Sequence, residues 1–536
     1  MIGLGYANVA GFLSYGFEPR RSFSCPREGG GSVRVEKKKP KISLILGDLP
    51  VLKRHGLADG TVTDLCLDSR RVTPGAIFFA LPGIRTDGCF FIEEAIDRGA
   101  IAVVAETPQR TNPEVAFFQV EDARLAMAQV ARKFFKQPDE DLAVHAITGT
   151  NGKTTVSYLT RFLLRETGVK TGMVGTIEYD LGERTVPSFR TTPEAIELYG
   201  MMAQMKASGC TDVVVETSSH GIDQKRMFGL HSRTATFLNL TQDHLDYHGS
   251  LEEYFHVKCR LFNGDNGKVP DTVILNLDDP KGKVLQDMVG EKTRLLTFGE
   301  SPEAMVRAEE VEMSPEGSTM KIIWPEGSAK VRSPLVGRYN VSNVLAAVSI
   351  VYAQGREMLH VLPQVARFPG VPGRMEKIVA GQNFPVLVDY AHTDDALRNA
   401  LQMLRGVTKG KLYLVFGCGG NRDRSKRPAM TRAALDYADQ VWATADNPRK
   451  EDLQQIFSDM SQAISEGDPI SFVEDRRRAI SLALDQAQEG DCVLIAGKGH
   501  ESFQEYADTV LPFDDRLVAA ELLQIKSVRH DSGETT

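Results

Sequence analysis

The residues with the clearest chemical potential lie in one short segment, residues 148–155, which reads T-G-T-N-G-K-T-T. It follows an apolar run at residues 143–147, and a strand that breaks into a glycine loop and continues as a helix directs backbone N–H groups and the positive end of the helix dipole at one point. Lys153 can reach the β- and γ-phosphates of a nucleotide there, and the Thr154 hydroxyl can bind Mg²⁺. The predicted nucleoside-triphosphate site consists of Gly149, Thr150, Asn151, Gly152, Lys153, Thr154 and Thr155.

The spacing of this segment departs from the common phosphate-binding pattern G-x-x-x-x-G-K-[ST]. Ile147 stands where the first glycine of that pattern would be, which leaves the shorter spacing G-x-x-G-K-T. The shorter loop argues against an ordinary P-loop kinase or GTPase. The alternative interpretation is a glycine turn beside an exposed lysine, without a ligand.

Length and composition indicate a globular protein of several domains. At roughly 150 residues a domain, the 536 residues predict three or four units. Hydrophobic residues make up 42% of the chain, and no apolar run approaches the ~20 residues of a membrane span. The net charge of -8 gives no support to nucleic acid as a partner. Seven scattered cysteines without a C-x-x-C pair predict reduced thiols in a cytoplasmic enzyme.

Residues 1–40 differ in composition from the rest of the chain. They are rich in Gly, Ser and Arg and carry three consecutive lysines near their end, which predicts a disordered N-terminal extension. The apolar start is interrupted by glycines and has no basic segment before it, which argues against a secretory signal. A transit peptide, a loose tail and an upstream start codon remain open interpretations.

The remaining chain alternates short apolar runs with helical patterns, which predicts an α/β fold of three domains. Residues 41–140 predict a small N-terminal α/β domain. Residues 141–368 contain the phosphate loop and unalternating β-branched runs, typical of a P-loop ATPase-like parallel sheet covered on both faces. Residues 369–536 follow linker glycines and prolines and predict a Rossmann-like domain with ligand-binding loops at the carboxyl ends of its strands.

Two further residues, an acid and an imidazole, stand where an ATP site needs metal ligands, and a third is an unusual lysine. Glu216 directly follows the apolar run at residues 213–215, where a P-loop ATPase carries its metal-binding acid. His244 lies in N-L-T-Q-D-H-L-D, and Lys258 is a lone lysine among aromatic residues in Y-F-H-V-K-C-R-L-F. Each has an ordinary explanation by itself, since most histidines satisfy local hydrogen bonds and most lysines are solvated. Together with the phosphate loop they predict an ATP site with two Mg²⁺ ions.

Longer motifs now point to a family. The strings G-T-N-G-K-T-T, E-T-S-S-H-G and D-H-L-D and the Lys258 segment together resemble the Mur ligase superfamily, which includes folylpolyglutamate synthase. In the last domain the strings G-R-M-E, D-Y-A-H-T, F-G-C-G-G-N-R-D, D-N-P-R and G-K-G-H-E resemble its diaminopimelate-adding branch. The resemblance runs in family order from about residue 41 to residue 526, so only the N-terminal extension lies outside it.

The resemblance implies an ATP-dependent, amide-forming ligase of peptidoglycan synthesis. In that reaction ATP phosphorylates the γ-carboxyl of the D-glutamate in UDP-N-acetylmuramoyl-L-alanyl-D-glutamate, and an amine of meso-diaminopimelate attacks the acyl phosphate. The catalytic residues implied are Lys153, Glu216, His244 and Lys258. The resemblance also implies Mg²⁺ ligands at Thr154, Glu216, His244 and Lys258, with Lys258 carbamylated to N6-carboxylysine, and adenine contacts at Asn340 and Asn343.

The resemblance assigns the two other substrates to different domains, with the N-terminal domain binding the UDP precursor and the C-terminal domain the amino acid. The implied contacts to the UDP-muramoyl dipeptide are Leu67, Ser69, Asn151, Thr191, Thr192, Ser218, Gln224 and Arg226. The implied contacts to diaminopimelate are Arg422, Asp446, Asn447, Pro448, Arg449, Gly497 and Glu501.

The choice of amino acid depends mainly on Arg449. Diaminopimelate has a second amino-acid centre that lysine lacks, and a guanidinium suits its carboxylate. The alternative for Arg449 is an ion pair at a helix start, since Glu451 and Asp452 follow it.

Two other functions stay open at this point. One is a related enzyme, a lysine-adding ligase or a folylpolyglutamate synthase. The other is a non-enzymatic structural or regulatory partner that retains the fold. The resemblance implies a monomer that binds small molecules, without nucleic acid and without membrane insertion.

Overall fold

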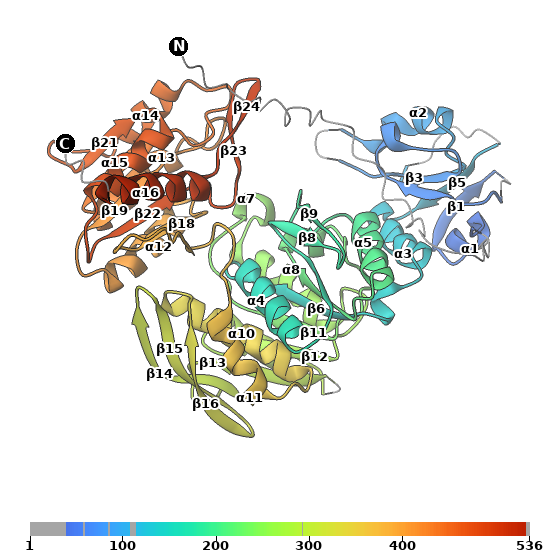
Figure 1. Cartoon of the computed structure of the whole chain (residues 1–536). Helices are drawn as coiled ribbons and strands as arrows, with labels where there is room; N and C mark the ends of the chain where they lie inside the picture. Colours follow the sequence, from blue (N-terminus) through green and yellow to red (C-terminus); the bar gives the residue numbers. More distant parts are fainter. Residues whose placement is uncertain (1–38, 57–58, 84–85, 108–113, 292, 532–536) are drawn as a thin grey trace, which may run out of the picture. The chain divides into compact units, whose positions relative to one another are not determined.

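The computed structural model describes residues 39–531, apart from 57–58, 84–85, 108–113 and 292 (Figure 1). The predicted N-terminal extension lies outside the described residues except for its last two. Three sheets with their covering helices follow one another along the chain, so the predicted three-domain α/β fold is confirmed. Within the described residues, no helix is both long and apolar enough to cross a membrane.

The N-terminal sheet has the order β1-β5-β4-β3-β2, with β1 antiparallel to β5 and the other pairs parallel. Its central strands are apolar and buried along their whole length, as expected for a sheet covered on both faces. The strands are β1 (Val51–His55), β2 (Asp64–Cys66), β3 (Ala76–Ala80), β4 (Ala102–Ala105) and β5 (Ala116–Val120). The helices are α1 (Ile42–Leu46), η1 (Ser69–Arg71), η2 (Gly88–Phe91), α2 (Ile92–Asp97) and α3 (Ala123–Phe134).

This sheet belongs to a compact unit that also includes residues from later in the chain. The described residues up to Pro138 form the unit together with residues 194–207 and 225–228. Residues 194–207 contain α5 (Ala195–Ala207), an apolar helix that packs on α3. The packing is close, because a Cβ at Gly200 would lie 3.2 Å from the Phe135 ring. All other described residues form the second compact unit.

The central sheet, in the second unit, has the order β16-β15-β14-β13-β12-β11-β6-β10-β7-β8-β9. Its strands from β14 to β7 in this order run parallel, and antiparallel strands extend it at both edges. Apolar residues of α4 and α10 share one core cluster with the sheet. The strands are β6 (Ala143–Thr148), β7 (Thr171–Val174), β8 (Glu178–Asp180), β9 (Thr185–Pro187), β10 (Asp212–Glu216), β11 (Thr234–Phe237), β12 (Thr272–Asn276), β13 (Arg294–Gly299), β14 (Val306–Ser314), β15 (Gly317–Trp324) and β16 (Gly327–Ser333). The helices are η3 (Pro138–Glu140), α4 (Lys153–Glu166), α6 (Ser219–Asp223), α7 (Leu245–His248), α8 (Leu251–Asn263), α9 (Pro280–Met288), α10 (Arg338–Ala353), α11 (Met358–Val361) and η4 (Leu362–Arg367).

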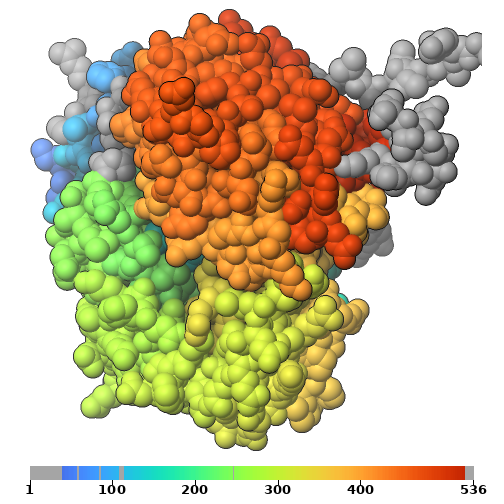
Figure 2. All heavy atoms as spheres, turned by 90° about the vertical axis from the view of Figure 1, so that its left-hand side faces the viewer, coloured from blue at the N-terminus to red at the C-terminus, as the bar shows by residue number. Residues whose placement is uncertain are grey.

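The C-terminal sheet has the order β17-β18-β22-β19-β20-β21 and is parallel except for β17. Residues of α12, α13 and α14 share one core cluster with its strands, and residues of α15 and α16 share a second, so the sheet is doubly wound. In the space-filling view these C-terminal residues, drawn orange to red, form one continuous body (Figure 2). The strands of this sheet are β17 (Glu376–Lys377), β18 (Val386–Asp389), β19 (Leu412–Phe416), β20 (Gln440–Thr444), β21 (Ile470–Val473) and β22 (Cys492–Ala496). Two further strands, β23 (Phe503–Tyr506) and β24 (Thr509–Pro512), pair with each other in a separate antiparallel sheet. The helices are α12 (Asp394–Val407), α13 (Lys426–Tyr437), α14 (Leu453–Ser461), α15 (Arg476–Gln486) and α16 (Asp515–Asp531).

Candidate active site

The predicted strand, glycine loop and helix are present. β6 ends at Thr148 and α4 begins at Lys153. Gly152 caps the helix with φ at 89°, and a Cβ there would lie 2.3 Å from Asn343 Oδ1, so this position requires glycine. Ile147 is fully buried and pairs with Glu216 of β10. The strand therefore continues through the position of the missing glycine, which explains why the loop is short.

A second segment, just after β11, holds the phosphate loop in shape. The Asn239 side chain forms two hydrogen bonds with the backbone of Asn151: Oδ1 accepts its N–H at 2.9 Å, and Nδ2 donates to its carbonyl at 3.1 Å. The Thr150 N–H donates to the Asn239 carbonyl at 3.0 Å, and Thr150 Oγ1 accepts the Thr241 N–H at 3.0 Å. Sequence reasoning missed this role for Asn239, although Asn239 begins the string that drew attention to His244.

Lys153 lies inside the loop. Its ammonium donates to the carbonyl oxygens of Gly149 at 2.8 Å and Thr150 at 2.9 Å. Burial lowers the pKa of Lys153, while the charge of Glu216 acts in the opposite direction. A lysine held among the loop carbonyls is in place to contact an anion that binds there.

Glu216 ends β10 next to the loop, and its side chain is fully buried. Its Oε2 accepts hydrogen bonds from Thr154 Oγ1 at 3.0 Å and Thr176 Oγ1 at 2.8 Å. Its Oε1 accepts the Thr176 N–H at 3.0 Å. A carboxylate and a hydroxyl this close form a hard oxygen donor pair, which suits Mg²⁺.

The described residues contain no group of three or more His, Cys, Asp and Glu side chains placed to hold a metal. A magnesium ion in a nucleotide site usually takes one or two carboxylates together with phosphate oxygens and water. The Thr154 and Glu216 pair beside the phosphate loop therefore fits a magnesium ion that arrives with a nucleotide.

Lys258, on α8, is buried beside the same loop with 1% of its surface exposed. Its Nζ donates to the Gly149 carbonyl at 3.2 Å and lies 4.4 Å from the centre of the Tyr254 ring. Burial lowers the pKa of Lys258 well below its usual value, and the charge of Lys153 lowers it further. The neutral amine is thereby favoured, and a neutral amine is the nucleophilic form of lysine.

The ring of Tyr254 lies between His244 and Lys258 and contacts both side chains. The His244 ring is 6.2 Å from the ring of Tyr254 and 4.9 Å from that of His220. Its side chain is 45% exposed, and its backbone is left-handed with φ at 53°. The structure thus brings together the loop, Glu216, Lys258 and His244 in the central domain.

Asn340 and Asn343 lie at the start of α10, beside the phosphate loop. The Asn340 amide donates to the Val336 carbonyl at 2.8 Å, and the Asn343 amide donates to Asn340 Oδ1 at 2.8 Å. Both side chains are buried. Asn343 packs against Gly152, which places this pair beside the phosphate loop.

The residues implied for the dipeptide precursor fall in both compact units. In the second unit Thr192 Oγ1 donates to the Glu216 carbonyl at 2.8 Å and accepts the Ser218 N–H at 2.9 Å. Thr191 Oγ1 lies 3.1 Å from Thr176 Oγ1, and Gln224 Nε2 donates to the Tyr247 hydroxyl at 3.2 Å. Thr191, Thr192 and Ser218 therefore adjoin the Glu216 site.

In the first unit Leu67 is exposed, and Ser69 Oγ donates to Glu94 Oε2 at 2.6 Å. Arg226 Nε lies 3.3 Å from Glu194 Oε1 in an ion pair.

The residues implied for the amino acid gather at the carboxyl ends of β19, β20 and β22. Arg449 has left-handed backbone with φ at 54°; its Nε donates to Glu505 Oε2 at 3.0 Å and its Nη1 to the Gly420 carbonyl at 2.9 Å. The alternative, in which Arg449 forms an ion pair with Glu451 or Asp452 at a helix start, is wrong, because the partner of Arg449 is Glu505. Glu451 pairs instead with Arg427, and Asp452 accepts the Gln454 N–H as the cap of α14.

The neighbouring residues of this group lie within a few ångströms of one another. Asn447 Nδ2 donates to Glu501 Oε2 at 2.9 Å. A Cβ at Gly497 would lie 2.8 Å from Asp446 Oδ2, and one at Gly420 would lie 1.8 Å from the Pro448 carbonyl oxygen, so both glycines permit close backbone packing. Arg422 is exposed, and its Cγ would lie 3.7 Å from a Cβ at Gly419.

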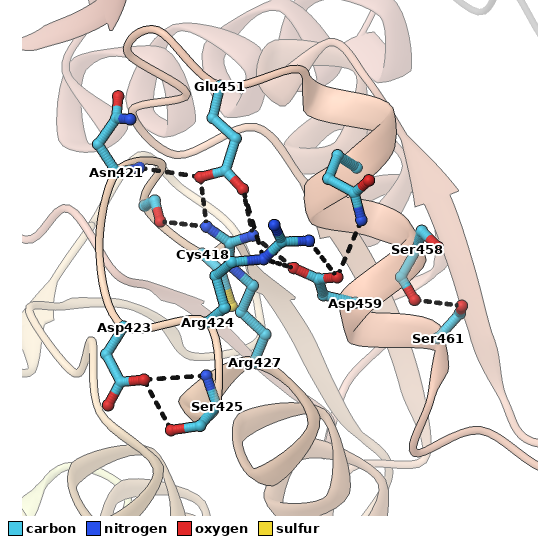
Figure 3. Close-up of polar contacts among 12 residues, drawn as sticks. Cys418, Asn421, Asp423, Arg424, Ser425, Arg427, Glu451, Ser458, Asp459 and Ser461 are labelled. Carbon is cyan, nitrogen blue, oxygen red and sulfur yellow. Dashed lines mark hydrogen bonds and ion pairs between the residues drawn. The ribbon is translucent and has the colours of Figure 1, made fainter.

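An ion-pair network holds these loops together (Figure 3). Arg427, on α13, is 1% exposed and donates to Glu451 at 2.8 and 2.7 Å and to Asp459 at 2.7 Å. The Glu451 carboxylate also accepts the Asn421 N–H at 2.9 Å. Hydrogen bonding to Arg427 lowers the pKa of Glu451 to about 2. The network joins the loop after β19 to the loop that carries Arg449.

Sequence reasoning missed this network. The available signal was the basic run R-D-R-S-K-R at residues 422–427. The acidic partners of its last residue, Arg427, are Glu451 and Asp459, which lie 24 and 32 residues further along the chain.

Comparison with known proteins adds an independent observation. The Mur ligase middle domain matches residues 147–351, the Mur ligase glutamate ligase domain residues 373–499, and the Mur ligase family catalytic domain residues 61–135.

Individual relatives match nearly end to end. The UDP-N-acetylmuramoyl-L-alanyl-D-glutamate--2,6-diaminopimelate ligase of Geobacillus thermodenitrificans is 43% identical over 89% of this chain and 98% of its own length. That of Solibacter usitatus is 44% identical over 87% of this chain and 94% of its own. A solved structure of a ligase of this name is 35% identical, with a TM-score of 0.66 over 87% of this chain and 96% of its own. A solved Mycobacterium tuberculosis folylpolyglutamate synthase, 16% identical with a TM-score of 0.56 over 76% of this chain and 95% of its own, shares the fold. The chain therefore belongs to the Mur ligase family, and within it to the UDP-N-acetylmuramoyl-L-alanyl-D-glutamate--2,6-diaminopimelate ligases.

Proposed function

We propose that this protein is an ATP-dependent ligase of peptidoglycan synthesis, which joins meso-diaminopimelate to the γ-carboxyl of the D-glutamate in UDP-N-acetylmuramoyl-L-alanyl-D-glutamate. One observation carries this proposal: a relative named for that reaction matches at 43% identity over 98% of its length. The phosphate loop and Arg449, which lie within the matched domains, would supply the chemistry that this reaction needs. We also infer that the protein acts as a cytoplasmic monomer on small molecules, without nucleic acid.

The reaction has a clear chemical requirement. A carboxylate is a poor electrophile. Transfer of the γ-phosphoryl group of ATP to a carboxylate oxygen releases ADP and gives an acyl phosphate, whose phosphate an amine can displace. The C–O bond to phosphate then breaks as the amide C–N bond forms, with loss of a proton from the amine, and phosphate is released. Lys153 and the N–H groups at the start of α4 are placed to hold the triphosphate for the first step.

The site also fits Mg²⁺. The residues that would hold it are Thr154 and Glu216, with His244 and a carbamylated Lys258 at a second ion. When bound, Mg²⁺ would reduce the repulsion between the carboxylate substrate and the triphosphate. The chain's own contribution is to fix the carboxylate of Glu216 through Thr154 and Thr176.

The surroundings of Lys258 support its carbamylation, because the buried side chain favours the neutral amine. Its neutral amine would attack CO₂, form a C–N bond and release a proton, which leaves a carboxylate at the end of the side chain. That product replaces a buried cation with an acidic oxygen ligand. In buffer depleted of CO₂ we expect activity to fall and to return when bicarbonate is added, while a Lys258→Ala variant stays inactive under both conditions. Activity that is independent of bicarbonate, with electron density for an unmodified lysine, would count against this modification.

The function itself is tested by measuring ADP release from purified protein. We expect release only when ATP, the nucleotide dipeptide precursor and meso-diaminopimelate are all present, and little when L-lysine replaces diaminopimelate. Equal ATP hydrolysis without either co-substrate would contradict the ligase. Turnover with lysine or with a folate substrate would favour a related ligase instead, and no turnover with any of them would favour a structural partner.

A further inference from the structure

Lys498 lies in the loop after β22 and is fully buried. Removal of an ammonium group from water is costly unless protein acceptors replace the water. Two residues implied for diaminopimelate binding supply these acceptors: Nζ donates to Asn447 Oδ1 at 3.1 Å and to Glu501 Oε2 at 3.1 Å. Lys498 thus connects the loop after β20 with the loop after β22.

These contacts determine which way the Asn447 carboxamide points. Its Oδ1 accepts hydrogen bonds from Lys498 Nζ and from the Glu505 N–H, the latter at 3.0 Å. Both partners are donors only, so the atom between them must be the oxygen, and Nδ2 must point the other way, where it donates to Glu501 Oε2.

As a result, two side chains of the loop after β20, Asn447 and Arg449, turn donors toward the same site. Glu505 connects the two residues concerned, because its N–H binds Asn447 Oδ1 and its Oε2 accepts from Arg449 Nε. Asn447 then presents the N–H of Nδ2 that Glu501 does not take, and Arg449 presents a guanidinium, a pair that suits a carboxylate. Glu501 receives both its Asn447 and its Lys498 contacts on Oε2, and we assign Oε1 to an ammonium group of the ligand.

We propose that Lys498 is a positioning residue that sets the hydrogen-bond polarity of Asn447, and so the preference of this site for an amino acid that carries both a carboxylate and an ammonium at its far end. The proposal rests on the proposed function and deepens it. Without Lys498, only the Glu505 N–H holds the carboxamide oxygen of Asn447 in place. A carboxamide that turns its oxygen toward the ligand disfavours a carboxylate and not an amine.

Two variants distinguish loss of the hydrogen bond from Lys498 to Asn447 from nonspecific disruption of the site. Lys498→Met keeps the length of the side chain but removes every donor, and we expect the KM for meso-diaminopimelate to rise at least about tenfold, while the KM values for ATP and the nucleotide precursor stay within about twofold. Lys498→Gln is also uncharged but returns an N–H donor, and its KM for diaminopimelate should stay within about threefold of wild type. Lys450→Met is the matched control, because Lys450 is an exposed lysine near the same loop, 3.8 Å from Asp508.

An unchanged KM in Lys498→Met, or an equal rise in the Met and Gln variants, overturns the proposal. If Lys498→Met does not fold, as judged by circular dichroism, the Gln variant decides alone: a KM within about threefold supports the proposal and a rise above about tenfold overturns it. Wild-type protein that releases no ADP with diaminopimelate would refute the proposed function, whereas normal wild-type turnover with an unchanged Met variant would refute only the role of Lys498.

Discussion

Arg449 is held in its orientation by protein contacts alone. Its Nε binds Glu505 and its Nη1 binds the Gly420 carbonyl, and a guanidinium has five N–H donors in a fixed plane. The remaining donors can therefore meet a carboxylate with little loss of side-chain entropy, because the rotamer is already fixed. Lys153 is likewise held by two loop carbonyls before a nucleotide binds.

Replacement of Arg449 tests its role in the choice of amino acid. We expect Arg449→Ala to raise the KM for meso-diaminopimelate by about 100-fold or more, because a site built for a polar group loses its main partner. Arg449→Lys should not restore it, since an ammonium lacks the bidentate geometry. The KM for ATP should stay near wild type, and Lys450→Ala serves as the control. An unchanged KM for diaminopimelate would refute the assignment.

Replacement of Asn239 tests the support of the phosphate loop. Asn239→Leu keeps the side-chain size but removes two hydrogen bonds to Asn151, each worth about 1 kcal/mol, so we expect the KM for ATP to rise roughly ten- to thirtyfold. The KM for diaminopimelate should change little. Asn263→Leu is a suitable control, because Asn263 is exposed and bonds only locally to Asp265 among its described contacts. Equal ATP affinity in both variants would show that the loop keeps its shape without Asn239.

Elements differ in how far the sequence predicts them. The phosphate loop is predicted well because its strand, glycines and helix are adjacent in the chain, so local geometry determines them. The pairs Arg427–Glu451 and Lys498–Asn447 join residues 24 and 51 positions apart. Those pairs depend on which strands become neighbours, here β19, β20 and β22, and a single chain gives no direct signal of that order.

Glu451, a carboxylate of the ion-pair network in Figure 3, contributes to the free energy of unfolding in a pH-dependent way. Arg427 lowers the pKa of Glu451 from 4.5 to about 2, so this carboxylate stabilises the folded state above its unfolded pKa and the contribution is lost as pH falls from about 4.5 toward 2. We therefore expect Glu451→Gln to destabilise the C-terminal domain at pH 7, and its difference from wild type to shrink steadily as the pH falls below about 4.5.

The measurement can be confined to this domain. The chain has two tryptophans, and in a Trp324→Phe background the fluorescence of Trp442 in β20 reports urea unfolding of the C-terminal sheet. Glu489→Gln, at an exposed glutamate of the same domain, is the control. A difference in midpoint between wild type and Glu451→Gln that does not shrink with falling pH would contradict the contribution of this carboxylate.

At the scale of the whole molecule, we expect Mg²⁺ to be required for catalysis and not for folding. Each sheet has its own apolar core, and the described residues offer no cluster of three or more metal-binding side chains. We expect EDTA to abolish ADP release and added Mg²⁺ to restore it, with unchanged circular dichroism and thermal midpoint throughout. A fall in the thermal midpoint with EDTA would instead indicate a structural ion.

The composition of the first compact unit has a consequence for the order in which the protein is made. Residues 194–207 and 225–228 belong to that unit, although the first strand of the central sheet begins at Ala143. A ribosome must therefore deliver the chain through residue 207 before α5 can pack on α3. During synthesis the face of α3 that α5 covers stays open while about 70 further residues are added, which at 5–20 residues per second is on the order of 4–15 seconds. A fragment cut at Pro138 would lack α5, so the face of α3 that packs on α5 would stay exposed.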